Sequence, residues 1–241
     1  MTAQLRTLGI LGADGRMGQA VEAASAGRYH VKARITLDQA DYAALSDCDC
    51  IVDFSAGPAL MAAIPHLKAD TPIVSGTTGL SDAEEAAVSE ASQMIPIFRS
   101  GNFSLGIAVL SSLARQAASV LGQGWDIEIL EMHHRHKLDA PSGTGLMLGE
   151  AVAAGRSVKL ADVAAHDRTG KREDGDIGFA VLRGGGVYGL PEVRLNSESE
   201  MITLGHQALN RDVFAHGALA AADWMIGKAP GLYSMNDLIS L

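Results

Sequence analysis

The 241-residue sequence contains few cysteines and few charged residues. Cys48 and Cys50 are its only cysteines, and a Cys-x-Cys pair in an extended segment cannot close an ordinary disulfide without strain. Two thiols are also a poor metal site, so we expect free, reduced thiols beside a buried strand. Only 20% of the residues are charged while 47% are hydrophobic, which excludes a disordered chain and fits a compact globular protein.

Basic residues are also scarce, with 19 Lys and Arg against 28 Asp and Glu, giving a formal net charge of −9. This charge opposes non-specific attraction to nucleic acid or to an anionic membrane. No stretch reaches the roughly 18 apolar residues of a membrane span, and the opening sequence MTAQLRTLGILGADG breaks its apolar run too early for a signal peptide. We therefore expect a cytoplasmic protein with neither nucleic acid nor membrane as a partner, in which an anionic substrate needs a local basic site.

The first half of the chain alternates short apolar segments with segments of helical composition, and contains no internal repeat. Repeated strand and helix units of this kind predict a doubly wound parallel sheet covered by helices on both faces. The predicted strands are Leu8–Leu11, Val31–Leu37, Ile51–Phe54, Pro72–Ser75 and Ile95–Phe98. The predicted helices are Arg16–Ala26, Ala59–Leu67 and a third from the Ser81–Glu84 capping box to about Met94.

The pattern changes after a helix predicted at Leu105–Leu121, because few helices then separate the strands. We predict a second, α+β domain with a mixed or antiparallel sheet, in which the polar segment 161–178 is a mobile loop. A helix at Val213–Ile226 is expected to return to the first domain. The predicted strands are Asp126–Met132, Phe179–Arg183, Glu192–Leu195 and Met201–Leu204.

A glycine-rich loop lies between the first strand and the first helix. In LGILGADGRMG, Gly12, Gly15 and Gly18 have a GxxGxxG spacing that departs from the GxGxxG dinucleotide fingerprint. The physical requirement is the same: a tight turn, close approach of backbone to a pyrophosphate, and a helix N-terminus directed at the phosphates. Arg16 could add a countercharge. A glycine triplet alone also fits a simple turn, but its position between strand and helix favours a nucleotide site.

Three further loops follow the carboxyl ends of predicted strands, where doubly wound sheets bind ligands. They contain residues 53–55, 76–79 and 100–103. Gly, Asn, Ser and Thr are common in turns for local reasons, so each loop alone has an ordinary interpretation. Three in succession at one edge of the sheet favour a ligand-binding edge.

Candidate functional residues are most concentrated in EMHHRHKLDAPSGTG, residues 131–145, where three histidines, Arg135 and Lys137 occur together. Ser142 then opens a predicted helix, whose N-terminal N–H groups could hold a carboxylate. A solvated basic loop is one alternative. Zinc is another, but His133 and His134 would point to opposite faces of a strand, and no Cys or HExxH arrangement completes a tetrahedral set, so we predict no metal.

These segments together resemble the 4-hydroxy-tetrahydrodipicolinate reductases, also called dihydrodipicolinate reductases. The resemblance covers nearly the whole chain, and HHRHKxDAPSGT is its most specific part. It implies a Rossmann-like dinucleotide-binding domain at 1–104, rejoined by 214–241, and a substrate-binding and oligomerisation domain at 105–213 that builds a homotetramer. It also implies NADH or NADPH as the cofactor and a small dicarboxylate as the substrate, in the diaminopimelate route of lysine biosynthesis. The matching segments are GADGRMG, DFS, GTTG, GNFSLG, EMHHRHKLDAPSGTG, IGFAVLRGG, HQALNRDVFAHGA and GLYSMNDL.

The resemblance also assigns residues. His133 matches the acid/base or oxyanion-stabilising residue, and Lys137 matches the proton donor. His134 matches a substrate-contacting histidine, while Gly143 and Thr144 match the residues that hold a substrate carboxylate. The residues that match the cofactor loops are Gly12, Ala13, Asp14, Gly15, Arg16, Met17, Gly76, Thr77, Thr78, Ser100, Gly101, Asn102 and Phe103.

Two departures from the family pattern leave questions open. Residues 36–38, Thr-Leu-Asp, stand where the family selects its cofactor: Asp38 would favour the ribose 2′-OH of NADH, whereas Lys32 or Arg34 could serve the 2′-phosphate of NADPH. Residues 187–191 contain no histidine, although the family commonly has one after the RGG segment, which puts the local sheet connection in doubt.

Two other functions compete with the reductase. A non-catalytic NAD(P)-binding sensor would keep the glycine loop but would not need His133 with Lys137. Another small-substrate reductase on the same sheet, such as an amino-acid dehydrogenase, would differ in its substrate.

Overall fold

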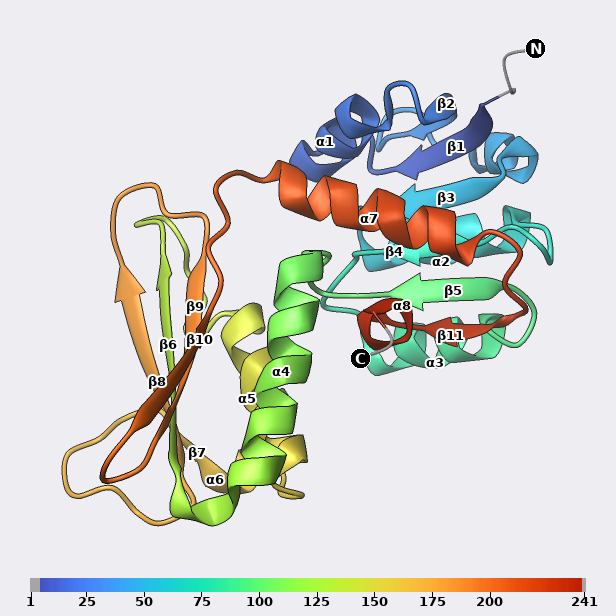
Figure 1. Ribbon diagram of the computed structural model, residues 1–241. Helices are drawn as coiled ribbons and strands as arrows, with labels where there is room; N and C mark the ends of the chain where they lie inside the picture. Colours follow the sequence, from blue (N-terminus) through green and yellow to red (C-terminus); the bar gives the residue numbers. More distant parts are fainter. Residues whose placement is uncertain (1–4, 240–241) are drawn as a thin grey trace. The chain divides into compact units, whose positions relative to one another are not determined.

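The computed structural model describes residues 5–239, which form two compact units (Figure 1). One unit contains the described residues up to Leu105 together with those from Arg211 onward, and the other runs from Gly106 to Asn210. The ends of the first predicted domain, residues 1–4 and 240–241, lie outside the described part.

A parallel sheet forms the centre of the first unit, with the strand order β11-β5-β4-β3-β1-β2. This confirms the predicted Rossmann-like sheet. The last strand in sequence, β11, was not predicted, since three residues are too few to display an alternating pattern. The strands are β1 (Arg6–Leu11), β2 (Tyr29–Ile35), β3 (Cys50–Asp53), β4 (Ile73–Ser75), β5 (Pro96–Arg99) and β11 (Gly231–Tyr233).

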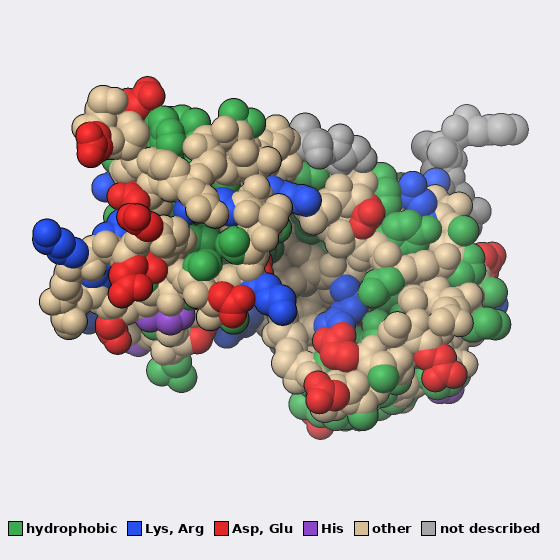
Figure 2. Space-filling model, turned by 90° about the horizontal axis from the view of Figure 1, so that it is seen from below, with side chains coloured by type: hydrophobic (Ala, Val, Ile, Leu, Met, Phe, Trp, Pro, Cys, Tyr) green, Lys and Arg blue, Asp and Glu red, His purple; other side chains and the backbone are tan. Residues whose placement is uncertain are grey.

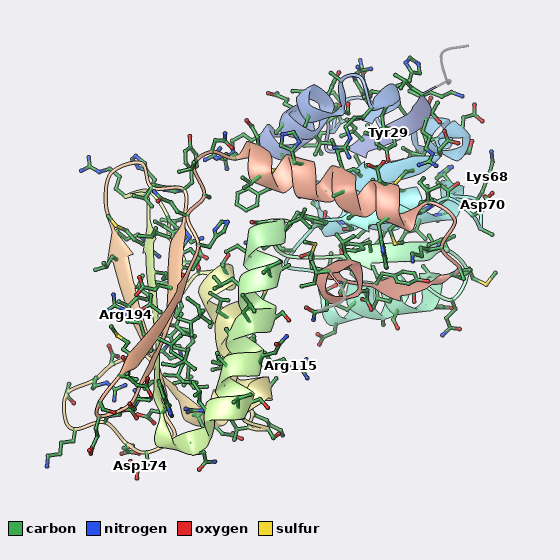
Figure 3. The ribbon with its side chains drawn as sticks, viewed as in Figure 1. Tyr29, Lys68, Asp70, Arg115, Asp174 and Arg194 are labelled. Carbon is green, nitrogen blue, oxygen red and sulfur yellow. The ribbon has the colours of Figure 1, made fainter. Side chains whose placement is uncertain are left out.

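Helices connect these strands, and a long C-terminal helix packs beside the first one. The elements are α1 (Arg16–Ser25), η1 (Tyr42–Asp47), α2 (Gly57–Ala63), η2 (Ile64–His66), α3 (Asp82–Ala91), α7 (Asp212–Met225) and α8 (Met235–Ile239). Asp223 of α7 accepts hydrogen bonds from Arg28, at 2.6 Å, and from the hydroxyl of Tyr29 at the start of β2 (Figure 3). These bonds, with the packing of α7 on α1, hold the returning segment in the first unit.

The second unit contains a mixed sheet with the order β10-β9-β6-β8-β7. Its central strand β6 runs parallel to β8 and antiparallel to β9, which confirms the predicted mixed sheet. The strands are β6 (Asp126–His133), β7 (Ala164–Ala165), β8 (Ile177–Arg183), β9 (Leu190–Asn196) and β10 (Met201–Gly205). The helices are α4 (Leu105–Leu121), which begins at the boundary, η3 (Gly122–Gly124), α5 (Gly143–Gly155) and α6 (Leu160–Val163).

The prediction of one mobile loop over residues 161–178 is wrong in part. The segment contains most of α6, the short strand β7 and the first residues of β8. β7 is formed by Ala164 and Ala165, which pair with Ile177 and Gly178. Two alanines carry no strand pattern in the sequence, so only the pairing partner defines this edge strand.

Helices α4 and α5 pack against one face of the mixed sheet and form the core of the second unit. On β6 the side chains alternate, so that Ile127 and Ile129 are fully buried in this core. Glu131 and His133 continue the same row toward the carboxyl end of the strand. The strand therefore leads from an apolar core to two buried polar side chains.

One helical segment, Leu105–Gly124, is long and apolar enough to cross a membrane, with a mean hydropathy of 1.3. The expectation that no stretch has this character therefore does not hold for the segment. Part of it is buried in the described structure, where Ile107, Leu110 and Ala114 belong to the core of the second unit. The core helix of a globular protein satisfies the same criterion of length and composition.

Cys48 and Cys50 are both free and buried, as the sequence predicts. Burial raises the pKa of the Cys48 thiol to about 11 and raises that of Cys50 further. Both thiols are therefore protonated at neutral pH and act as small apolar side chains.

Candidate active site

The glycine loop packs so tightly that side chains have no room at two of its positions. Gly12 follows β1 with a φ of +79°, and a Cβ atom there would lie 2.6 Å from the carbonyl oxygen of Phe54. A Cβ on Gly18 would lie 2.1 Å from the carbonyl oxygen of Gly12. The loop backbone is thus pressed against the end of β3 and the start of α1, where a phosphate can approach N–H groups directly.

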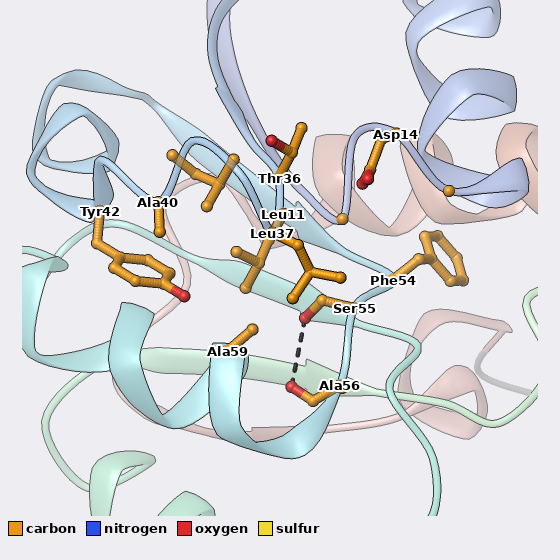
Figure 4. A pocket seen from close by; sticks show the side chains of 13 residues that line it. Leu11, Asp14, Thr36, Leu37, Ala40, Tyr42, Phe54, Ser55, Ala56 and Ala59 are labelled. Carbon is orange, nitrogen blue, oxygen red and sulfur yellow. Dashed lines mark hydrogen bonds between the residues drawn. The ribbon is translucent and has the colours of Figure 1, made fainter.

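A pocket of about 360 Å³ opens beside this loop, between the ends of β1, β2 and β3 (Figure 4). Its walls are mainly apolar, and Asp14 is the one charged side chain among the described residues that line it. The lining residues are Leu11, Gly12, Asp14, Gly15, Ile35, Thr36, Leu37, Ala40, Tyr42, Phe54, Ser55, Ala56 and Ala59. Such a pocket suits a flat, apolar adenine ring with its ribose at the edge.

The three charged candidates for cofactor selection, Lys32, Arg34 and Asp38, do not line this pocket. Lys32 pairs with Asp47 at 3.2 Å, and Arg34 is hydrogen-bonded to Glu22. Asp38 lies beyond β2, whereas its neighbours Thr36 and Leu37 contribute to the pocket wall.

A second hollow of about 270 Å³ is lined by residues 15–17, by Phe54 and Ser55, and by residues 76–78. It shares Gly15, Phe54 and Ser55 with the first pocket, so the two hollows are adjacent. Arg16 is placed to offset phosphate charge. An adenine pocket, a glycine cradle and an adjoining polar hollow fit a nicotinamide dinucleotide.

The loop at residues 100–103 was also predicted to bind the cofactor, but it does not line either hollow. Phe103 is buried and stacks on Phe98, with ring centroids 5.9 Å apart. Ser100 accepts a hydrogen bond from the N–H of Asn102 at 3.1 Å, so this part of the loop is braced internally. Gly101 lies next to Thr78, whose methyl group would be 3.8 Å from a Cβ atom at that position.

A buried carboxylate connects the loops after β3 and β4. Asp53 accepts hydrogen bonds from the N–H of Ser55 at 2.9 Å, the hydroxyl of Ser75 at 2.6 Å and that of Thr77 at 2.8 Å. Its side chain is fully buried. The position of Asp53 at the binding edge is predictable from the sequence, but this role depends on which strands are neighbours.

The basic segment begins at the last residue of β6. His133 is buried, and its carbonyl oxygen accepts a hydrogen bond from Gly184 at 2.9 Å. The N–H of Arg135 donates to Gly185 at 3.2 Å, so the loop between β8 and β9 braces the segment through its backbone. β9 pairs with β6 as well, and the missing histidine at 187–191 therefore leaves the sheet connection intact.

Lys137 forms an ion pair with Asp139 at 2.8 Å. The hydrogen bond from Lys137 lowers the pKa of the Asp139 carboxyl. Arg183, for which the sequence motifs predict no role, donates to the carbonyl oxygens of Lys137, at 3.3 Å, and of Asp139, at 2.5 Å. It holds the turn that carries the lysine, and its register opposite His133 in β8 was not visible in the sequence.

Burial lowers the pKa of His133, and the carboxylate of Glu131 opposes this effect. The charges of Lys137, Arg183 and His134 lower it further. Within residues 5–239, the Nδ1 atoms of His133 and His134 are buried without a hydrogen-bond partner. Gly189 packs against the other nitrogen of His133, since a Cβ atom there would lie 3.3 Å from Nε2.

Ser142 begins α5 and accepts a hydrogen bond from the N–H of Gly145 at 3.0 Å. Gly143 is exposed and Thr144 is half-buried at the first positions of the helix. The positive end of the α5 dipole therefore follows closely after the basic segment in the same unit, an arrangement suited to carboxylates. Among the described residues, no cluster of three or more His, Cys, Asp and Glu is arranged to hold a metal ion.

The face of the molecule in Figure 2 intersperses Lys and Arg with Asp and Glu. The whole sequence has a formal net charge of −9. The basic segment is thus a local feature of an acidic protein.

Comparisons with known proteins identify the same family in both halves of the chain. Residues 6–103 match the family described as "Dihydrodipicolinate reductase, N-terminus", and residues 106–239 match its C-terminal counterpart. The 4-hydroxy-tetrahydrodipicolinate reductase of Caulobacter vibrioides is 45% identical, covering 96% of both chains. That of Zymomonas mobilis is 46% identical, covering 97% of both chains.

A solved structure shares the fold. The dipicolinate-bound dihydrodipicolinate reductase from Paenisporosarcina sp. TG-14 superimposes with a TM-score of 0.76 at 19% identity, covering 98% of this chain and 100% of that one. The resemblance seen in the sequence is confirmed, and the chain belongs to the dihydrodipicolinate reductase family.

Proposed function

We propose that the protein is a 4-hydroxy-tetrahydrodipicolinate reductase that uses NADH or NADPH in lysine biosynthesis. The observation that carries the proposal is the specific segment at residues 131–145, which places a buried histidine, a lysine and a helix N-terminus in one unit. Relatives with this activity in their names match nearly the whole chain. A nucleotide sensor would need the glycine loop but not this second cluster.

The first unit would hold the cofactor. The adenine ring would occupy the apolar pocket, and N–H groups of residues 12–17 with the guanidinium of Arg16 would hold the pyrophosphate. Thr77 and Thr78 line the adjoining hollow and would contact the remaining part of the dinucleotide. When bound, the nicotinamide supplies the hydride, and the chain supplies position and electrostatics.

The second unit would hold the substrate. Gly143 and Thr144 would bind one substrate carboxylate at the start of α5, and His134 would contact the substrate beside it. Overall, the 4-hydroxyl and a ring proton leave together as water, and one hydride and one proton then enter the unsaturated ring. Lys137 would release its ion pair with Asp139 and protonate the ring carbon, while His133 would stabilise the charge that develops on the ring.

We expect a cytoplasmic homotetramer. Support for self-association comes from the outer face of the mixed sheet, where Met132 lies in register with Leu182 on one side and Leu190 on the other. Leu182 is 57% exposed and Leu190 38% exposed, so the strands present an apolar patch to solvent. Light scattering with size-exclusion chromatography would give the assembly size.

The decisive test is a coupled assay that follows nicotinamide absorbance with freshly generated 4-hydroxy-tetrahydrodipicolinate. His133→Ala and Lys137→Ala should each lose about 100-fold or more in kcat, the range for removal of an acid or base. Lys171→Ala, which removes an exposed lysine from the same unit, should keep full activity. Unchanged turnover in both test variants would refute the assigned roles, and oxidation with amino-acid substrates instead would favour a dehydrogenase.

A further inference from the structure

The buried row on β6 contains an ionisable side chain that the proposed reaction does not use. Glu131 follows Ile127 and Ile129 on the core face of the strand, and its side chain is fully buried. Burying a carboxylate is costly unless donors and charges compensate it. The groups around it should therefore reveal what it does.

Glu131 fixes the start of α5. One carboxylate oxygen accepts a hydrogen bond from the N–H of Ser142 at 2.7 Å, and the other accepts from the hydroxyl of Ser142. That hydroxyl in turn accepts from the N–H of Gly145 at 3.0 Å. A Cβ atom on Gly145 would lie 2.8 Å from the Glu131 carboxylate, so the first turn of the helix is packed directly on it.

The same carboxylate faces the catalytic segment. Its Oε2 atom lies 4.0 Å from Nδ1 of His133, and its Oε1 atom lies 4.0 Å from a guanidinium nitrogen of Arg183. Neither contact is a hydrogen bond in length, but both are close enough for a substantial charge interaction at a buried site. Glu131 is thus the one negative charge adjoining His133 in the described part of the chain.

We propose that Glu131 is a positioning residue whose buried carboxylate holds the substrate-binding start of α5 and orients and electrostatically supports His133. The inference rests on the roles proposed above for His133 and for residues 143–144. It adds that one side chain couples the two parts of the substrate site. A change at Glu131 should therefore disturb substrate binding and the protonation of His133 together.

The charges that act on His133 come from two strands and the turn after β6. Glu131 favours the protonated imidazole, whereas Lys137, Arg183 and His134 disfavour it, as does burial. The part of α5 nearest Glu131, residues 142–145, carries no titratable side chain. Removing the negative charge while keeping the burial should lower the pKa of His133 further.

Glu131→Gln removes the charge at constant size, and Ser142→Ala is its matched control. Ser142→Ala loses the cap of α5 but keeps the carboxylate, so it should raise KM for the substrate without lowering the titration midpoint of His133. Glu131→Gln should both raise KM for the substrate and lower the titration midpoint of His133. Its kcat/KM should fall about tenfold or more, with KM for the cofactor nearly unchanged. Glu131→Asp keeps the charge, so the titration midpoint of His133 should lie between those of the wild type and Glu131→Gln.

The titration is measured on the full chain without substrate, by NMR of histidine labelled with 13C at Cε1 and assigned through His133→Gln. Circular dichroism would establish that each variant is folded. We expect the His133 midpoint to move to lower pH in Glu131→Gln by about one unit. An unchanged midpoint, or equal increases in KM for substrate and cofactor, would overturn the inference. Full activity in His133→Gln would instead refute the catalytic role proposed for His133. The effect of Glu131 on the titration of His133 would still be tested by the midpoint.

Discussion

The carboxylate of Asp53, the last residue of β3, accepts a hydrogen bond at 2.8 Å from the hydroxyl of Thr77, which follows β4. Ser55, on the loop after β3, donates to the other carboxylate oxygen. The loops after β3 and β4 are therefore fixed to one buried anion. Since both loops line the second hollow, their relative position determines its shape.

Asp53→Asn should weaken cofactor binding and destabilise the fold. Four groups donate to this carboxylate: the N–H and the hydroxyl of Ser55 and the hydroxyls of Ser75 and Thr77. An amide accepts only through its oxygen, so one or more of these groups would be left unsatisfied. We expect a loss on the order of 1–3 kcal/mol in the free energy of unfolding, with a higher Kd for NADH and NADPH. Ser75→Ala removes a single donor and should have a smaller effect. Denaturant unfolding and fluorescence titration would measure both, and an Asp53→Asn variant with wild-type stability and affinity would contradict the role.

Gly18→Ala should disrupt the phosphate cradle. A Cβ atom at this position would lie 2.1 Å from the carbonyl oxygen of Gly12, which is backbone and cannot rotate away. We expect the loop to shift, with a destabilisation of about 1–3 kcal/mol for overpacking and a marked rise in cofactor Kd. Gly124→Ala is the control, because a Cβ atom there meets nothing within 4 Å. Equal cofactor affinity in the two variants would contradict the tight packing.

Much of the fold could be predicted because its strands carry local patterns. The parallel sheet was recognisable from short apolar segments, and the start of α3 from Ser81 with Glu84, whose capping box is present. β7 and β11 were missed because strands of two and three residues are defined by their neighbours rather than by their own residues.

In the candidate site, the sequence predicts only residues that belong to recognisable motifs. The segment at 131–145 identified His133 and Lys137, but the contribution of Arg183 depends on the register between β6 and β8, which the sequence does not display. No role was predicted for Glu131, because its hydrogen bonds with Ser142 depend on how the start of α5 packs on β6. Phe103 belongs to a predicted cofactor loop, and its side chain lies in the apolar core.

Cofactor selection should respond to Leu37. This side chain lines the apolar pocket just after β2, and no cationic residue lies among the described lining residues. We expect the wild-type protein to discriminate weakly between NADH and NADPH. Leu37→Arg should add a charged hydrogen bond to the 2′-phosphate, worth about 1.5–3 kcal/mol, or roughly 10- to 150-fold in the ratio of kcat/KM values. Leu37→Gln adds a shorter polar side chain without the charge and should leave the ratio nearly unchanged. An equal ratio of kcat/KM values in the two variants would contradict a 2′-phosphate site beside residue 37.

Stability should fall between about pH 7 and pH 5 because of two histidines. Burial lowers the pKa of His133 and of His206 below the ordinary value of 6.5. As the pH falls through 6.5, the unfolded chain takes up these protons before the folded chain does, so the free energy of unfolding decreases. Above pH 6.5 the contribution of the two histidines to the free energy of unfolding is fully present. Carboxyls with a lowered pKa, such as Asp139, lose their stabilising contribution only in more acidic solution. Urea unfolding at pH 7.5 and at pH 5.5 measures this decrease in the free energy of unfolding. The decrease should be smaller in a variant with both histidines changed to Gln than in the wild type, while the control His30→Gln, which changes an exposed residue, should show the wild-type decrease. An identical decrease in all three proteins would mean that other groups cause the pH dependence.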